Sequence, residues 1–116
     1  MSGKGTGITT HVLDTAIGRP AVGVPVLLER RADAGSWLLV GRGLTDADGR
    51  ARDLCPGGLE VGLYRLTFDT AAYHVARGTT GFYPYVTIVF EVQDPAQPHH
   101  VPLLLSPFGY STYRGS

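Results

Sequence analysis

Residues 99–116 read HHVPLLLSPFGYSTYRGS, and the fold of the chain can be worked out from this stretch. An apolar run at 101–105 follows two adjacent histidines and leads through Ser-Pro-Phe-Gly into an aromatic, polar ending. Chain ends usually fray because they have little to pack against. Here two tyrosines and an arginine fall within residues 110–116. The pattern predicts a strand, a turn and a last strand, with an ordered tail that carries part of an active site.

Along the whole chain, sixteen glycines and eight prolines separate short apolar segments, which is typical of all-β proteins. Residues 70–76 predict the one short helix, and a tight turn is expected at 45–50, where Gly49 can adopt a positive φ. We predict an antiparallel β-sandwich of about eight strands, with residues 1–7 flexible and 8–116 forming one domain. β-Branched or alternating residues place the earlier strands at 8–13, 24–31, 36–45, 50–54, 63–69 and 85–92.

The composition argues against several classes of partner. Ten basic side chains balance ten acidic ones, whereas nucleic acids and anionic membranes favour a basic patch, so neither is a predicted partner. No apolar run approaches the ~20 residues of a membrane span, and the N-terminus lacks the apolar core of a signal peptide. The single cysteine, Cys55, cannot form an internal disulfide and shows no sign of a nucleophile's surroundings. We expect a cytoplasmic protein with Cys55 half-buried beside a turn.

Histidine titrates nearest neutrality, so the four histidines are the first candidates for chemistry. His11 shares a strand face with Thr9 and Leu13. His99 and His100 point to opposite faces of their strand, so only one of them can join a given site. Spacing alone does not show whether His11 meets His100, which neighbouring terminal strands would allow, or is a structural histidine.

No metal site is predicted. No H-x-x-x-H spacing occurs, no cysteine accompanies the histidines, and the adjacent pair cannot reach one ion from a regular strand. The acidic turn at 46–49 lacks the third acidic position and the distal glutamate of a calcium loop. His74 is expected to be exposed on the helix, with no role beyond solvation. Arg50 is either a solvated charge or a planar donor to a carbonyl or an anion. The residues alone predict a His, Arg, Tyr and Ser site of unknown substrate.

Three blocks of the sequence resemble the 5-hydroxyisourate hydrolases, a transthyretin-related family. The ending HVPLLLSPFGYSTYRGS resembles one family signature, THVLDT at 10–15 followed by GRPA at 18–21 resembles another, and TDADGR at 45–50 a third. The likeness spans about residues 8–116, and FYP at 82–84 resembles the family's Phe-Phe-Pro. Where the family usually has His-Tyr-His before Val-Pro-Leu, this chain has Pro-His-His. His100 therefore matches the functional histidine, and His99 replaces an aromatic residue.

The resemblance implies a transthyretin-like sandwich of two four-stranded sheets and a homotetramer that is a dimer of dimers. It implies hydrolysis of 5-hydroxyisourate at the cyclic amide N1–C6 bond, giving 2-oxo-4-hydroxy-4-carboxy-5-ureidoimidazoline, with no metal or organic cofactor. The sites would lie in the channel between dimers. The implied catalytic residues are His11, Arg50, His100 and Ser116, and the implied substrate-binding residues are His11, Arg50, Tyr113 and Arg114.

Two other functions are compatible with the same scaffold: a small-ligand carrier like transthyretin, and a structural or partner-binding sandwich with His11 and His100 merely buried. The carrier has lost the histidine pattern and the Tyr-Arg-Gly-Ser ending, and a secreted carrier would need a signal peptide. We therefore predict the hydrolase. A neutral imidazole would take a proton from water, and Arg50 would offset charge on the carbonyl oxygen. Which histidine is the base stays open, with a slight preference for His11.

Overall fold

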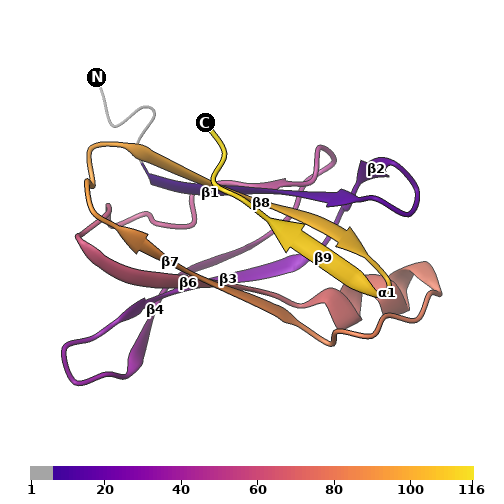
Figure 1. Cartoon of the computed structure of the whole chain (residues 1–116), viewed down its shortest axis with the longest axis horizontal. Coiled ribbons are helices and arrows are strands. Elements are labelled where there is room, and N and C mark those ends of the chain that lie inside the picture. Colours follow the sequence, from indigo (N-terminus) through magenta and orange to yellow (C-terminus); the bar gives the residue numbers. More distant parts are fainter. Residues whose placement is uncertain (1–6) are drawn as a thin grey trace.

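The computed structural model describes residues 7–116, and its strands form two sheets packed face to face (Figure 1). In the first sheet the order is β2-β1-β8-β9, with β5 also paired to β1, and in the second it is β4-β3-β6-β7. Within residues 7–116, α1 (Thr70–Arg77) is the one helix, and it is neither long nor apolar enough to cross a membrane. The strands are β1 (Gly7–Asp14), β2 (Arg19–Pro20), β3 (Pro25–Arg31), β4 (Trp37–Leu44), β5 (Arg50–Ala51), β6 (Gly62–Phe68), β7 (Val86–Val92), β8 (Pro98–Ser106) and β9 (Gly109–Thr112).

The predicted all-β sandwich with one short helix is confirmed, with differences in detail. The first sheet has five strands, not four, because the two-residue strands β2 and β5 pair with different parts of β1. β1 and β8 run parallel, which is possible because they are joined by most of the chain and not by a hairpin. Gly7, expected in the flexible N-terminus, begins β1, and residues 1–6 lie outside the described part of the chain.

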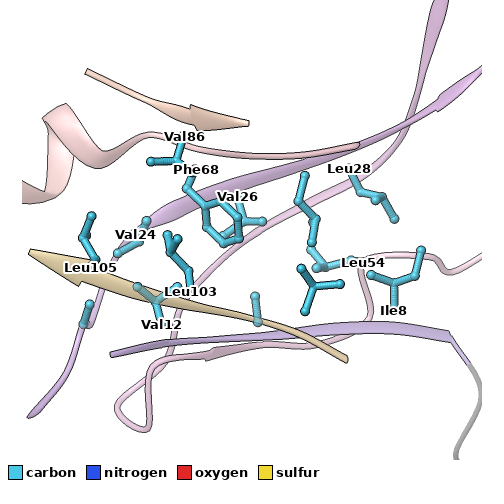
Figure 2. Close-up of a cluster of buried hydrophobic side chains, with 14 of the residues drawn as sticks. Ile8, Val12, Val24, Val26, Leu28, Leu54, Phe68, Val86, Leu103 and Leu105 are labelled. Carbon is cyan, nitrogen blue, oxygen red and sulfur yellow. The ribbon is translucent and has the colours of Figure 1, made fainter. Parts of the chain in front are cut away.

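Alternating apolar residues fill the space between the two sheets (Figure 2). Val12 of β1 and Leu103 of β8 are fully buried against the second sheet, where Val26, Leu28 and Phe68 face them. Strands predicted at residues 24–31 and 63–69 from their alternation thus contribute their apolar faces to this core. Each such side chain contributes about 1.5–3 kcal/mol on leaving water. Because side chains alternate along a strand, the intervening residues of β1 and β8 point to the outer face of the first sheet.

The strand predicted at residues 50–54 is shorter than expected, because the chain turns away from β1 after Ala51. Asp53 takes a left-handed φ of 58°, and Leu54 is fully buried in the core. The carbonyl of Leu54 lies where Gly41 leaves room, since a Cβ on Gly41 would be 2.0 Å from that oxygen. The chain thus crosses to the second sheet and leaves Arg50 at the exposed edge of the first.

The helix predicted at residues 70–76 is confirmed, but the exposure predicted for His74 is wrong. Gly78 ends the helix in the left-handed conformation, as expected of a C-cap glycine. The His74 side chain is buried, at 4% exposure, because the chain after the helix folds back over it. A Cβ on Gly81 would lie 2.3 Å from the His74 ring, and Thr79 Oγ1 lies 3.3 Å from His74 Nδ1.

Candidate active site

The outer face of the first sheet gathers the histidines and the arginine singled out in the sequence. In the β1–β5 register His11 lies opposite Arg50, and in the β1–β8 register Thr9 lies opposite His100. Side chains that are neighbours on one face of a sheet stand about 5 Å apart at Cβ. His11 and His100 are therefore diagonal neighbours on this face, and the parallel register answers the question that spacing left open.

The turn at residues 46–49 sets the position of Arg50. Oδ1 of Asp46 accepts hydrogen bonds from the backbone N–H groups of Asp48 (2.9 Å) and Arg50 (3.0 Å). The hydrogen bond from Arg50 is the main cause that lowers the pKa of the Asp46 carboxyl. Gly49 has the predicted positive φ, 77°, and a Cβ there would lie 2.4 Å from the Val12 carbonyl oxygen. Only glycine lets this turn lie against β1, where it delivers Arg50 opposite His11.

The His100 ring is held along two opposite edges. On one edge, Oγ1 of Thr9 lies 2.8 Å from Nδ1. On the other, the tail continues the line of β9 alongside β8, and the Gly115 N–H donates to the His100 carbonyl at 2.8 Å. A Cβ on Gly115 would lie 2.4 Å from Cδ2 of the ring. The ordered tail predicted from the sequence is confirmed, and the glycine of its Tyr-Arg-Gly-Ser ending is required by contact with His100.

The surroundings of His100 keep its imidazole neutral. Burial is the main cause that lowers its pKa from the ordinary 6.5, and the charges of Arg50 and His11 act in the same direction. A backbone hydrogen bond with Thr9 opposes them. Because desolvation and nearby positive charge both disfavour the imidazolium, His100 is neutral near pH 7. A neutral imidazole is the form that a general base requires.

Tyr113 and Arg114 come directly before Gly115, which pairs with His100. Both are exposed, and they line a groove of about 150 Å³ that also reaches His99 and His100. Arg114 Nη2 is 3.4 Å from Gln97 Oε1, at the connection between β7 and β8. The groove puts both tail residues within reach of a ligand that contacts His100, and their substrate-binding roles stay predictions.

Two residues of this cluster, Thr9 and Gly115, have no role assigned from the sequence. Strand alternation already places Thr9 on the face of His11, but only the β1–β8 register puts it opposite His100. Gly115 belongs to the terminal motif, and its close contact with the His100 ring explains why this position is a glycine. Ser116 follows it, exposed, and its hydroxyl has no hydrogen-bond partner within residues 7–116. The catalytic role of Ser116 stays a prediction.

A larger hollow, about 740 Å³, lies on the outer face of the second sheet. Its floor is formed by the cross-strand neighbours Leu27, Arg42 and Thr67, and its charged residues are Arg42 and Asp69. None of the four histidines lines it, so the histidine chemistry belongs to the first sheet. Within residues 7–116, no group of three or more His, Cys, Asp or Glu side chains lies where it could hold a metal ion.

His99 points away from His100, as predicted for adjacent residues of a strand, and only 6% of it is exposed. Its Nδ1 is buried and has no hydrogen-bond partner among the described residues. A buried polar atom without a partner costs about 1–3 kcal/mol. We therefore expect His99 to lower the stability of the fold relative to an apolar ring of similar size at this position.

Replacement of His99 by phenylalanine is expected to raise the free energy of unfolding by about 1–3 kcal/mol, because it removes the unpaired nitrogen and keeps a ring. Denaturant unfolding of both proteins at one protein concentration measures the difference. His74→Phe is the matched control and should give no gain, since the His74 Nδ1 has Thr79 at 3.3 Å. A lower unfolding midpoint for H99F would contradict the prediction.

Comparison with known proteins connects this site with two functions. The model of the HIUase/Transthyretin family matches residues 8–115. The chain is 46% identical over 118 residues to the 5-hydroxyisourate hydrolase of Mus musculus, with 100% of both chains covered. The structure is similar to the 5-hydroxyisourate hydrolase of Klebsiella pneumoniae (TM-score 0.82, 35% identity, 94% of this chain and 98% of that one). It is also similar to sea bream transthyretin in complex with thyroxine (TM-score 0.88, 32% identity, 93% of both chains).

Proposed function

The chain belongs to the HIUase/Transthyretin family, and from this premise we propose that it is a 5-hydroxyisourate hydrolase. Water adds to the C6 carbonyl, the N1–C6 bond breaks, and the product is 2-oxo-4-hydroxy-4-carboxy-5-ureidoimidazoline. One observation carries this conclusion: His11, Arg50 and His100 share one sheet face, with the Gly115 backbone held against the His100 ring. A carrier with the fold of the sea bream protein binds its ligand without a reaction and would not need these proton-transfer and charge-stabilising groups.

The reaction divides between the two imidazoles and the guanidinium. One neutral imidazole takes a proton from the attacking water, and the second can return a proton to the leaving N1. The charge of His11 is one of the causes that lower the pKa of His100. Arg50 offsets the negative charge that develops on the C6 oxygen. Tyr113 and Arg114 would bind the substrate from the groove beside His100, and Ser116 would complete the site at the end of the tail.

We propose that the active form is a homotetramer, a dimer of dimers, in the cytoplasm. Two observations support the tetramer: β7 and β9 each lie at an edge of a sheet, and Val89 and Tyr110 are exposed there. The outer face of the first sheet is open in one chain, and a second dimer would cover it and enclose the substrate. Cys55 is a half-buried free thiol, as predicted, which fits a reducing compartment.

A stopped-flow absorbance assay with freshly made 5-hydroxyisourate tests the function. The compound decays unaided, so the quantity to record is the decay rate with protein minus the decay rate in buffer alone. This difference is measured as a function of protein concentration. We expect an excess that is proportional to protein and saturates with substrate. A carrier would bind a ligand without consuming it, and a decay rate equal to that in buffer would overturn the proposal.

The protein is expected to remain active below pH 6.5, as measured by the pH profile of kcat/KM. We propose His100 as the base, in place of the slight preference for His11 drawn from the sequence, because Thr9 and Gly115 hold its ring. Activity is then lost as pH falls through the pKa of His100, which lies below the ordinary 6.5. Arg50→Gln removes one of the positive charges that lower this pKa, so the acid limb should move to higher pH even as the maximum falls. An acid limb that stays in place in R50Q would contradict the electrostatic coupling between these two residues.

A further inference from the structure

We propose that Thr9 is a positioning residue for the reaction: it holds the His100 ring with Nδ1 protonated and leaves Nε2 as the proton acceptor. This inference rests on the proposed function. It starts from the β1–β8 register, which places Thr9 opposite His100, and from the 2.8 Å contact between Thr9 Oγ1 and His100 Nδ1. In a neutral imidazole one nitrogen donates and the other accepts, and the partner of one nitrogen selects the tautomer of both.

The position of the Thr9 hydroxyl, taken with the proposed reaction, assigns the ring proton to Nδ1. A hydroxyl can donate or accept, so the 2.8 Å contact alone is compatible with either tautomer. Because Nδ1 is occupied by Thr9, Nε2 is the nitrogen left for the attacking water. A neutral imidazole whose Nε2 accepts a proton carries its own proton on Nδ1, and Thr9 Oγ1 then accepts the hydrogen bond from Nδ1–H.

The contacts on the other edge of the ring fix its orientation. Gly115 packs against Cδ2, the carbon beside Nε2, while Thr9 holds Nδ1. A half-turn of the ring would break the Thr9 contact, so one orientation is favoured. The charged and titratable groups that act on the ring are Arg50 and His11. A guanidinium only donates hydrogen bonds, so an unprotonated Nε2 is compatible with Arg50 nearby. A protonated Nε2 would be a second donor beside Arg50 and would not be compatible with it.

A neutral partner suits this base. In many sites the base is oriented by a third group that is often a carboxylate, and a carboxylate also raises the pKa of the histidine. Thr9 fixes the ring without adding negative charge. The imidazole therefore stays neutral near pH 7 and keeps its orientation, which are the two properties that proton removal from water requires.

The test compares Thr9→Val, which has the same shape without the hydroxyl, with Thr9→Ser, which keeps the hydroxyl. For T9V we expect kcat to fall about tenfold with little change in KM, the rate equivalent of one hydrogen bond. T9S should restore kcat to within about threefold of the wild type. Thr10→Val is the matched control: its hydroxyl donates to the Val101 carbonyl at 2.5 Å in the core, so T10V should lower stability and leave kcat unchanged.

A second readout does not depend on turnover. ¹⁵N NMR of the His100 side chain distinguishes the Nδ1–H from the Nε2–H tautomer in the folded protein above pH 7. We expect Nδ1–H in the wild type and in T9S, and a shift toward Nε2–H in T9V. Nε2–H in the wild type would overturn the inference without any variant, and so would a T9V protein with wild-type kcat and an unchanged tautomer. A wild-type protein that does not consume 5-hydroxyisourate would overturn the function instead, while the NMR result still tests the contact.

Discussion

Replacement of His100 by alanine is expected to lower turnover of 5-hydroxyisourate at least ~100-fold, the lower end of what a positioned general base contributes. The His100 side chain is held by Thr9 and by Gly115, and burial keeps it neutral. Alanine removes the ring nitrogen that we propose takes the proton, and it leaves the backbone hydrogen bond from Gly115 in place. The loss should therefore appear in kcat with the assembly intact, as measured by steady-state kinetics and size-exclusion chromatography.

The adjacent residue supplies the matched control. His99→Phe changes a histidine one position away whose side chain points to the other face of β8, and it should keep wild-type turnover. His11→Ala and Arg50→Ala should also lose at least ~100-fold, in line with loss of a proton-transfer group or an oxyanion donor. Near-normal turnover in any two of the three alanine variants would show that the outer face of the first sheet is not the site.

Deletion of residues 113–116 is expected to abolish activity while the tetramer persists. The deletion removes the Gly115 N–H that binds the His100 carbonyl and the backbone that packs against Cδ2 of the ring. It also removes the two side chains that line the groove beside His100, Tyr113 and Arg114. The buried core contains no residue of this tail, so the fold should tolerate the loss. An active truncated tetramer would show that the tail has no catalytic importance.

A point substitution separates the backbone contact from the rest of the tail. Gly115→Ala places a Cβ 2.4 Å from Cδ2 of His100, so the tail or the ring must move, and we expect at least ~10-fold lower kcat. Gly109→Ala is the matched control. A Cβ there meets only Ser106 Oγ at 3.7 Å, which is ordinary contact, and turnover should be unchanged. Equal kinetics for the two variants would contradict the proposed clamp on His100.

Likeness of fold does not distinguish the hydrolase from the carrier. The TM-score is 0.88 to the thyroxine-bound sea bream protein and 0.82 to the Klebsiella pneumoniae hydrolase. The fold of a thyroxine-bound protein and the fold of a hydrolase thus both match this chain closely. The proposed distinction lies in a few side chains on one sheet face, where the register places His11, Arg50 and His100.

The local pattern of the chain was enough for the helix and for most of the strands. Alternation has a period of two, so it placed Thr9 and His11 on one face of their strand and His99 and His100 on opposite faces without any knowledge of partners. Glycine at position 49 indicated the turn before Arg50, and the aromatic ending indicated an ordered tail. The resemblance of the motifs then indicated the function.

Relations between distant segments needed the folded chain. Paired residues of β1 and β8 are 91 positions apart, and the hydrogen bonds that set their parallel register leave no local trace in either segment. For the same reason, the burial of His74 by residues that follow the helix and the close contact of Gly115 with His100 could not be foreseen. Which residues face inward or outward follows from neighbours in the chain, but which outward residues meet follows from neighbours in space.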